Sequence, residues 1–484
     1  MDDQRAPRGV WWIAGGTIAL LLAVAGRYGW HRDELYFLEA GDHLQWGFVD
    51  QPPFTPFVAG VVDAIAPGNL LALRVLPAVA TGLSIVLGAR IVRELGGSRG
   101  AQVAGAAVLA SGGFLLGVGH LLSTAVFDLT AALAVIWLLT RLLRTEDTRL
   151  WFWIGTVAGL ALLNKSLVVL LVGALVAGLV ADRRWDLLWT PRLVGGGVIA
   201  LAVAAPNLAW QASNGWPQLD MAEALSERLA GENRATLVPL QLLFVGPFLV
   251  GLLYYGARWL SSDGRARPFR PLVWSWPIGL VITFATGGRP YYALPFSLVI
   301  ALAGVVAWET RSKPLRRLAV LAALNAAFSV PLALPVLPMS ATRVSATVNE
   351  AVAETVGWPE LVDQVADAVE TLPESERRDV VLLAATYGEA GAIDRFGGAR
   401  GLPQAYSGHN GYGFFRRPTN DTATVVAIRH PEPVLLQWFE ECETVDVVDN
   451  GFDVDNEVQG TPIVVCRELR RPWAETWPEI RFLS

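Results

Sequence analysis

Residues 318–338 read LAVLAALNAAFSVPLALPVLP, a run without a charged side chain that follows directly after Arg316 and Arg317. A helix that crosses the hydrocarbon core of a membrane needs about 20 mostly apolar residues, so this run is long enough to span it. From Met339 onward no run of this kind occurs. The sequence therefore predicts two domains: a transmembrane domain, residues 1–338, and a soluble domain, residues 339–484.

The composition agrees with many membrane spans. Of 484 residues, 53% are hydrophobic and 17% are charged, whereas soluble globular chains carry about 25% charged residues. The net charge of −6 offers no basic surface, so we expect no nucleic-acid partner. Eleven mostly apolar runs are candidate transmembrane helices, and the two short ones that flank Asn164-Lys165 could instead form one broken helix: Val10–Ala25, Leu70–Ala89, Gly100–Val118, Ser123–Thr140, Leu150–Leu163, Ser166–Val180, Leu193–Trp210, Leu237–Ala257, Leu272–Thr286, Tyr291–Trp308 and Leu318–Pro338.

The distribution of Lys and Arg predicts the orientation. With the N-terminus inside, the inner connections hold 19 of these residues and the outer connections hold six, which matches the positive-inside rule. The soluble domain then lies outside the cytoplasmic membrane, and it is acidic, with 24 Asp and Glu against 12 Arg. Ala23-Val24-Ala25 also resembles a signal-peptidase site, and cleavage there would leave the next loop outside as well.

The soluble domain alternates helical and strand patterns. Residues 349–372 and 389–396 predict helices, and residues 380–385 and 423–428 predict buried strands, which together indicate a small α/β domain. Cys442 and Cys466 both lie in it, where a disulfide is chemically permitted. Two buried thiols are the alternative.

The first outer loop holds the densest group of ionisable residues. It contains His31-Arg32-Asp33-Glu34, followed by apolar residues at close to helical spacing, which predicts an amphipathic helix on the membrane surface. Asp33 and Glu34 would lie at its N-terminus, where negative charge is favourable. They either cap this helix or take part in chemistry at the membrane surface.

Other polar residues are predicted at the same membrane face. Asp128 lies inside a span, where a carboxylate suggests function, and His120 precedes it. Lys165 lies between apolar segments and needs an anionic partner, either Asp128 or a ligand phosphate. Asp33, Asp128 and His120 could meet around a divalent ion, although no cluster has dependable metal-ligand spacing. The outer connection 211–236 predicts a mobile lid or a passive connector.

These motifs resemble those of bacterial family 39 glycosyltransferases, enzymes of the GT-C fold related to protein O-mannosyltransferases and to the lipid A aminoarabinose transferase. The soluble-domain motifs are similar to those of actinobacterial members. The matching segments follow one another through most of the chain: residues 31–37, 47–54, 127–128, 163–165, 206–217, 289–295, 387–392 and 407–410.

The resemblance implies transfer of a sugar from a polyprenyl-phosphate carrier to an acceptor at the extracytoplasmic face. It implies that Asp33 is the catalytic base, with Glu34 beside it. Asp128, the third residue expected in the catalysis, would position either Lys165 or the acceptor. Aminoarabinose transferases have a lysine where this chain has Gln51, so Arg289 and Lys165 would hold more of the phosphate charge. The residues expected to contact substrate are His31, Asp50, His120, Tyr291 and Tyr292.

Chemical reasoning from the residues leads to a similar function. Soluble nucleotide sugars are not expected outside the cell, so a sugar donor would arrive on a lipid. A base removes the acceptor proton, and cations stabilise the departing phosphate; with Asp33 as the one base, we expect inversion at the sugar. The acceptor can be a protein, a glycan or a lipid. Two alternatives are a transporter of polyprenyl-linked sugars, whose charges would extend through the membrane, and a membrane-anchored glycan-binding protein.

Overall fold

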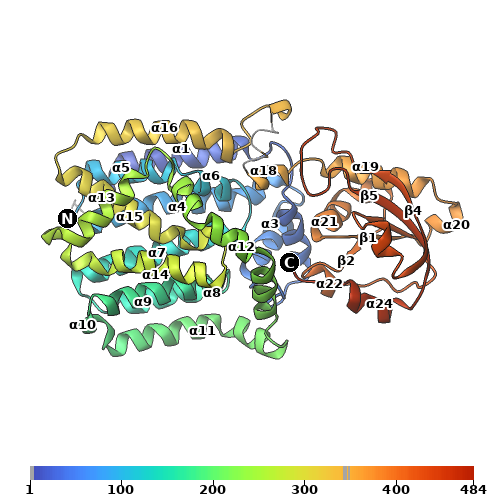
Figure 1. Ribbon diagram of the computed structural model, residues 1–484, viewed down its shortest axis with the longest axis horizontal. Helices are drawn as coiled ribbons and strands as arrows, with labels where there is room; N and C mark the ends of the chain where they lie inside the picture. Colours follow the sequence, from blue (N-terminus) through green and yellow to red (C-terminus); the bar gives the residue numbers. More distant parts are fainter. Residues whose placement is uncertain (1–4, 342–345, 347–348) are drawn as a thin grey trace.

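The computed structural model describes residues 5–341, 346 and 349–484. A bundle of helices is joined at one end to an α/β domain, and α2 (Arg32–Asp42) and α3 (Phe54–Ile65) lie where the two parts meet (Figure 1). The other helices of the bundle have the following bounds: α1 (Arg8–Val24), α4 (Leu70–Glu94), α5 (Arg99–Ala110), α6 (Gly113–His120), α7 (Thr124–Thr145), α8 (Leu150–Leu162), α9 (Val168–Ala181), α10 (Trp185–Leu188), α11 (Pro191–Ser213), α12 (Pro217–Val245), α13 (Gly251–Ser262), η2 (Gly264–Phe269), α14 (Arg270–Thr286), η3 (Pro290–Ala293), α15 (Leu294–Thr310) and α16 (Leu315–Ala333).

Several helices are long and apolar enough to cross a membrane. In the described part of the chain there are five, or six if α5 and α6, which meet at a 63° bend, count as one span. Shorter apolar helices of 10–17 residues are α1, α3, α8 and α9. The structure confirms a polytopic helical protein, and the number eleven stays a prediction.

Two expected segments differ from the structure. The run Leu237–Ala257 is not one helix, because α12 ends at Val245 and Gly246 has a positive φ of 105°. The connection 211–236 is mostly helical, since α12 begins at Pro217. The apolar runs around Lys165 form two helices, α8 and α9, separated by residues 163–167, and the alternative of one broken helix stays a prediction.

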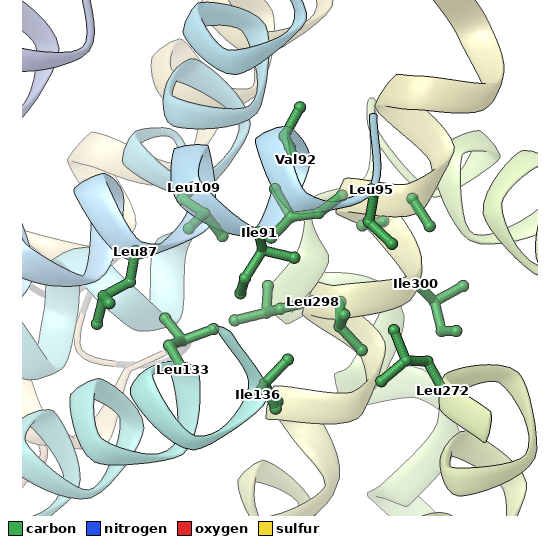
Figure 2. Packing of buried hydrophobic residues seen from close by; sticks show 14 of the residues in the cluster. Leu87, Ile91, Val92, Leu95, Leu109, Leu133, Ile136, Leu272, Leu298 and Ile300 are labelled. Carbon is green, nitrogen blue, oxygen red and sulfur yellow. The ribbon is translucent and has the colours of Figure 1, made fainter. Parts of the chain in front are cut away.

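The core of the bundle surrounds α15, whose apolar window is 83% buried. Leu298 and Ile300 of this helix pack in one cluster with side chains of α4, α7 and α14 (Figure 2). A helix so enclosed is rigid, and η3, which carries two of the expected site residues, continues directly into it.

The soluble domain contains one five-stranded sheet in the order β2-β1-β3-β5-β4. The central β1 pairs in parallel with β2 and β3, while β5 runs antiparallel to β3 and β4. Cys442 of β4 and Cys466 of β5 are cross-strand partners and form a disulfide. The expected strands 380–385 and 423–428 are confirmed as β1 and β3. The helices and strands of the soluble domain have the following bounds: η4 (Met339–Ala341), α18 (Glu350–Ala353), α19 (Trp358–Glu370), α20 (Glu374–Arg377), β1 (Val381–Ala384), α21 (Tyr387–Phe396), η5 (Gly397–Arg400), β2 (Ala405–Ser407), α22 (Tyr412–Phe415), β3 (Val425–Ile428), α23 (Glu432–Leu435), β4 (Phe439–Val447), β5 (Pro462–Leu469) and α24 (Trp473–Ile480).

The two parts share a hydrophobic cluster. Leu35 and Phe37 of α2 pack in the same cluster as Trp358 of α19 and Ile393 of α21. Helices α2 and α21 approach closely at Gly391, where an added Cβ would lie 2.9 Å from the Cβ of Leu35. The soluble domain is therefore packed directly on the segment that carries Asp33.

Candidate active site

The N-terminus of α2 is organised by a capping box. The N-cap is His31, whose Nδ1 accepts a hydrogen bond from the backbone N–H of Asp33 at 3.1 Å. Glu34 Oε2 accepts one from the backbone N–H of His31 at 2.9 Å, so the two residues satisfy the free helix donors reciprocally. Asp33 is not needed as a cap, and its carboxylate is available for other contacts.

Glu34 forms a buried ion pair with Arg74 of α4. The guanidinium donates to both carboxylate oxygens, from Nε to Oε1 at 2.9 Å and from Nη2 to Oε2 at 2.7 Å, which is the strong bidentate geometry. The backbone N–H of Leu122 adds a third donor at 3.0 Å. Glu34 was expected beside Asp33 in the chemistry, but it lines none of the cavities described below. We therefore reassign it to holding α2 against α4.

His120 lies on the other side of Arg74. Its Nε2 is 3.4 Å from Arg74 Nη1, and the ring is buried with 4% of its surface exposed. It too lines none of the cavities described below. His120 was expected to contact substrate, and the structure instead places it behind the capping box.

Asp33 contacts the soluble domain. Its Oδ1 accepts a hydrogen bond from Tyr387 Oη at 2.9 Å and lies 3.7 Å from Arg32 Nε. Burial by itself raises the pKa of this carboxyl, but His31, Arg32, the Tyr387 hydroxyl and Arg289 outweigh it and hold the pKa of Asp33 below its usual value. The carboxylate is thus ionised at neutral pH.

Tyr387 is held in place by stacked rings. It lies against Tyr36 of α2 with ring centroids 4.7 Å apart, and against His409 with centroids 4.6 Å apart. His409 in turn stacks on Phe482 at 4.7 Å. Tyr387 also opens α21, where Thr386 and Glu389 form a second capping box. The stack and the cap together fix the phenol that touches Asp33.

Asp33 borders a cavity of about 610 Å³, here called the central cavity. It brings together most of the residues expected from the sequence, including the three phosphate-binding candidates Arg289, Lys165 and Gln51. Its polar and charged lining comprises Arg32, Asp33, Tyr36, Asp50, Gln51, Asn164, Lys165, Gln218, Arg289, Tyr291, Tyr292 and Tyr387.

Asp50 and Gln51 are neighbours in the first outer loop, and both line the central cavity. Asp50 Oδ1 accepts a hydrogen bond from Tyr36 Oη at 2.8 Å, and burial raises the pKa of Asp50 to about 6. The Gln51 side chain is buried, and its Nε2 has no hydrogen-bond partner among the described residues. A buried donor of this kind is costly unless a ligand oxygen reaches it.

Lys165 lies on the turn between α8 and α9. Its Nζ donates to Tyr291 Oη at 2.7 Å and lies 5.5 Å from the ring centroid of Tyr292. Neither tyrosine carries a negative charge, and Lys165 forms no ion pair within 4.0 Å with a described residue, so the ammonium can bind an anion in the cavity. Asp128, which was expected in the chemistry, lines a separate small cavity with Tyr292 and interacts electrostatically with Lys165. Asp128 therefore does not line the central cavity, and its part in the chemistry stays a prediction.

Arg289 occupies the segment between α14 and η3. This segment is tied to α12, because Asn233 donates to the Gly287 carbonyl at 2.8 Å and Gln241 donates to the Pro290 carbonyl at 2.6 Å. No described residue forms a hydrogen bond or ion pair with the guanidinium of Arg289. A charged group without an internal partner on a cavity wall is suited to an anionic ligand.

A second cavity of about 320 Å³, here called the apolar cavity, also borders Asp33 and Arg289. His31 is on its wall as well. The rest of its lining comes mainly from apolar side chains of α6, α12 and α16, among them Phe114, Leu243, Phe244, Phe328 and Leu332.

The three groups proposed for a divalent ion do not form one site. Asp33 borders the central cavity, Asp128 a separate one, and His120 contacts Arg74. The three carboxylates that approach one another among the described residues are Glu350, Glu354 and Glu457, with ligand atoms within 4.8 Å. Glu457 is already engaged by Arg32 and Arg429, so this group carries no metal assignment here.

Comparison with known proteins shows similarity in a part of the sequence and in the fold. Residues 50–210 match the family model described as dolichyl-phosphate-mannose-protein mannosyltransferase. The structure resembles the ArnT of Cupriavidus metallidurans in its apo state, with 14% identity, 94% of this chain and 97% of that chain covered, and a TM-score of 0.63. The same protein bound to undecaprenyl phosphate gives 15% identity, the same coverage of 94% and 97%, and a TM-score of 0.59. No curated protein sequence matches the chain.

A more distant likeness is to an oligosaccharyltransferase of Archaeoglobus fulgidus, with 15% identity, 87% of this chain and 68% of that chain covered, and a TM-score of 0.47. The ArnT likeness gives the fold, which is GT-C. The family match, over residues 50–210, adds a similarity in sequence to the mannosyltransferases that the family model describes.

Proposed function

We propose that this protein is a glycosyltransferase, and that it moves a sugar from a polyprenyl-phosphate carrier to an acceptor hydroxyl at the outer face of the cytoplasmic membrane. One observation carries the proposal. The ionised carboxylate of Asp33 and the unpartnered guanidinium of Arg289 border the same two cavities, one polar and one apolar. A lipid-linked donor has the matching halves, a charged phosphate and a hydrocarbon chain.

The donor phosphate binds Arg289 and Lys165 in this proposal. The guanidinium can form two parallel hydrogen bonds to phosphate oxygens, and the ammonium adds a point charge. Gln51 Nε2 supplies a neutral donor on the same cavity. The apolar cavity beside Arg289 accommodates the first isoprenyl units, whose burial is favourable. The ArnT crystal form with undecaprenyl phosphate supports a carrier of this class.

Asp33 acts as the base. It takes the proton of the acceptor hydroxyl as the hydroxyl oxygen attacks the anomeric carbon. The bond between that carbon and the phosphate oxygen breaks, and the negative charge that develops on the carrier phosphate is stabilised by Arg289 and Lys165. One displacement without a covalent sugar-enzyme intermediate inverts the anomeric centre.

The sidedness of the site rests on the charge distribution. The 19 Lys and Arg of the connections on one side, against six on the other, favour placing Asp33 and the soluble domain outside the cell. A transporter would need charges through the depth of the membrane, whereas Asp33, Lys165 and Arg289 line one cavity. A bound divalent ion stays an untested prediction.

The experiment is a transfer assay with the full chain in lipid nanodiscs. The donor is a radiolabelled polyprenyl-phosphate sugar, and the mannosyl form is tested first because of the family match. Mass spectrometry of envelope glycans and glycoproteins, with and without the gene, identifies the natural product. We expect label to leave the carrier only with active enzyme; a purified chain that binds no polyprenyl phosphate and releases no sugar would contradict the proposal.

A further inference from the structure

Among the residues that the structure describes, the soluble domain contributes three to the wall of the central cavity: Tyr387, Asn410 and Ser484. Tyr387 donates to the proposed base. Asn410 ends the motif of residues 407–410, and Ser484 lies in the segment 481–484, which follows α24 and returns to the helical bundle beside α12 (Figure 1). The steps of the proposed reaction give no role to Asn410 or Ser484.

This segment is held against the motif by main-chain hydrogen bonds. The N–H of Phe482 donates to the Gly408 carbonyl at 3.0 Å, and the N–H of Asn410 donates to the Phe482 carbonyl at 3.0 Å. The rings of His409 and Phe482 stack with centroids 4.7 Å apart. A Cβ at Gly408 would collide with the carbonyl oxygen of Ile480. The close approach therefore requires glycine at this position, and the segment follows one fixed path.

Asn410 fixes the backbone of Ser484. Its Nδ2 donates to the Ser484 carbonyl at 3.2 Å, and its Oδ1 accepts from the Ser484 N–H at 3.1 Å. Asn410 is buried and has a positive φ of 49°, a conformation that asparagine adopts more readily than most other residues with a side chain. The residue type at 410 thus suits both its backbone and its two hydrogen bonds, and Ser484 is held at the cavity wall.

His409 determines how the Ser484 hydroxyl is used. Burial lowers the pKa of His409 to about 3, so the ring is neutral and carries one proton. Nδ1 accepts the N–H of Tyr387 at 3.4 Å, so the proton is on Nε2, which donates to Ser484 Oγ at 2.7 Å. Oγ is the acceptor in this contact. The hydroxyl hydrogen has no acceptor among the described residues and is available to an oxygen atom in the central cavity.

A neutral hydrogen-bond donor at this place suits a sugar better than a phosphate. The cations Lys165 and Arg289 come from the helical bundle and match the phosphate of the carrier. In the proposed displacement the anomeric carbon lies between that phosphate and the acceptor hydroxyl at Asp33. Tyr387, which bonds Asp33, is one ring stack away from the imidazole that holds Ser484. The sugar ring therefore occupies the part of the cavity that the soluble domain borders.

We propose that Ser484 is a specificity-determining residue, whose hydroxyl donates a hydrogen bond to one hydroxyl oxygen of the sugar on the polyprenyl-phosphate carrier. Asn410 and His409 are positioning residues, because they act on the sugar through Ser484. The soluble domain thus takes part in selecting the sugar, whereas the bundle holds the lipid phosphate. This inference rests on the proposed function and adds a group that recognises the sugar.

The test is equilibrium binding to the full chain in phosphatidylcholine nanodiscs. The probes are undecaprenyl phosphate alone and undecaprenyl phosphate that carries mannose, glucose or arabinose. We expect at least one sugar form to bind more tightly than the bare carrier. Ser484→Ala should lower the ratio of the two affinities by about threefold to tenfold, the range for one neutral hydrogen bond, and should leave binding of the bare carrier unchanged. Ser484→Thr keeps the hydroxyl and should keep most of the ratio.

Deoxy sugars separate a direct contact from a structural effect. Each hydroxyl of the preferred sugar is replaced by hydrogen in turn, because a site built to bond a hydroxyl discriminates against the analogue that lacks it. One deoxy form should bind the wild type more weakly than the parent sugar does, and should bind wild type and Ser484→Ala equally. A general loosening of the segment would instead weaken every form in Ser484→Ala, which would overturn the inference.

The matched control is Ser375→Ala, which removes an exposed hydroxyl on α20 that lines none of the cavities named above and should not change the ratio. An unchanged ratio in Ser484→Ala would overturn the inference. It is the result expected if Ser484 instead faces a ligand in the cavity of about 360 Å³ that it also borders, between the soluble domain and α12. A wild type that binds bare carrier but no sugar form more tightly overturns the inference alone, whereas a wild type that binds no undecaprenyl phosphate contradicts the proposed function itself.

Discussion

Tyr387 Oη donates a hydrogen bond to Asp33 Oδ1 at 2.9 Å, although 354 positions separate the two residues in the chain. The phenol stabilises the ionised carboxylate and limits its rotation. Because Tyr387 opens the first helix after β1, the soluble domain contributes to the proposed catalytic centre. In this proposal Tyr387 is a positioning residue, since it would act on the substrate through Asp33.

Replacing Tyr387 with Phe tests this role. Hydrogen bonds to charged groups contribute about 1.5–3 kcal/mol, so we expect the turnover number to fall by about tenfold or more. The KM for the donor should change little. Loss of the bond raises the pKa of Asp33, so the acid limb of the activity profile should move to higher pH. The control is Tyr406→Phe, which alters a ring packed on Trp477; an unshifted acid limb in Tyr387→Phe would argue against the role.

The Glu34–Arg74 pair predicts a defect of stability. Glu34→Gln leaves a buried guanidinium without its counter-charge, which costs about 3–5 kcal/mol. Thermal unfolding in detergent should show the loss. Glu374→Gln breaks a fully exposed pair with Arg378 and should change stability by less than about 1 kcal/mol. A Glu34→Gln protein that unfolds like wild type and has lost transfer would instead support a catalytic Glu34.

The close approach at Gly391 predicts that docking of the soluble domain sets activity. A Cβ there would lie 2.9 Å from Leu35 Cβ and 3.2 Å from the Leu35 carbonyl carbon, so α21 must move away from α2 and carry Tyr387 with it. Gly391→Ala should reduce transfer at least as much as Tyr387→Phe. Gly398→Ala, where no atom lies within 4 Å of the added Cβ, should have full activity. Equal activity of both variants contradicts this account.

The raised pKa of Asp50 predicts a stability that depends on pH. Burial raises this pKa from 3.8 to about 6, so the folded protein binds the proton more tightly than the unfolded chain. The stabilisation is fully present below about pH 4 and is lost as pH rises through about 6, with an upper value of about 3 kcal/mol. The difference in melting temperature between pH 5 and pH 8 should shrink in Asp50→Asn. An unchanged difference would show that Asp50 is not the group that titrates.

The sequence predicts much of this arrangement. Apolar runs ended by arginines locate the helical bundle, and the helix signal after Asp33-Glu34 locates α2. Asp33, Lys165 and Arg289 were expected at one face, and they line one cavity. These features depend on local patterns or on charge at span ends, which a sequence displays directly.

The remaining contacts depend on long-range packing. Arg74 lies in a run that reads as a span, and nothing local shows that Glu34, 40 positions earlier, neutralises it. The sequence displays the motif around Tyr387, but the distance between Tyr387 and Asp33 follows only from how α21 packs on α2. Helix α12 was missed because its first half covers cavities rather than a continuous core, so its apolar residues show little periodicity. Strand β4 is mostly exposed and charged, so it lacks a strand pattern.

The most direct measurement is single-turnover transfer from a polyprenyl-phosphate sugar by Asp33→Asn, with carrier binding measured in parallel. The account predicts that transfer falls by 10²-fold or more, the range of general base catalysis, while undecaprenyl phosphate binds as to wild type because Arg289 and Lys165 are intact. Transfer near the wild-type rate would contradict the assignment of Asp33 as the base.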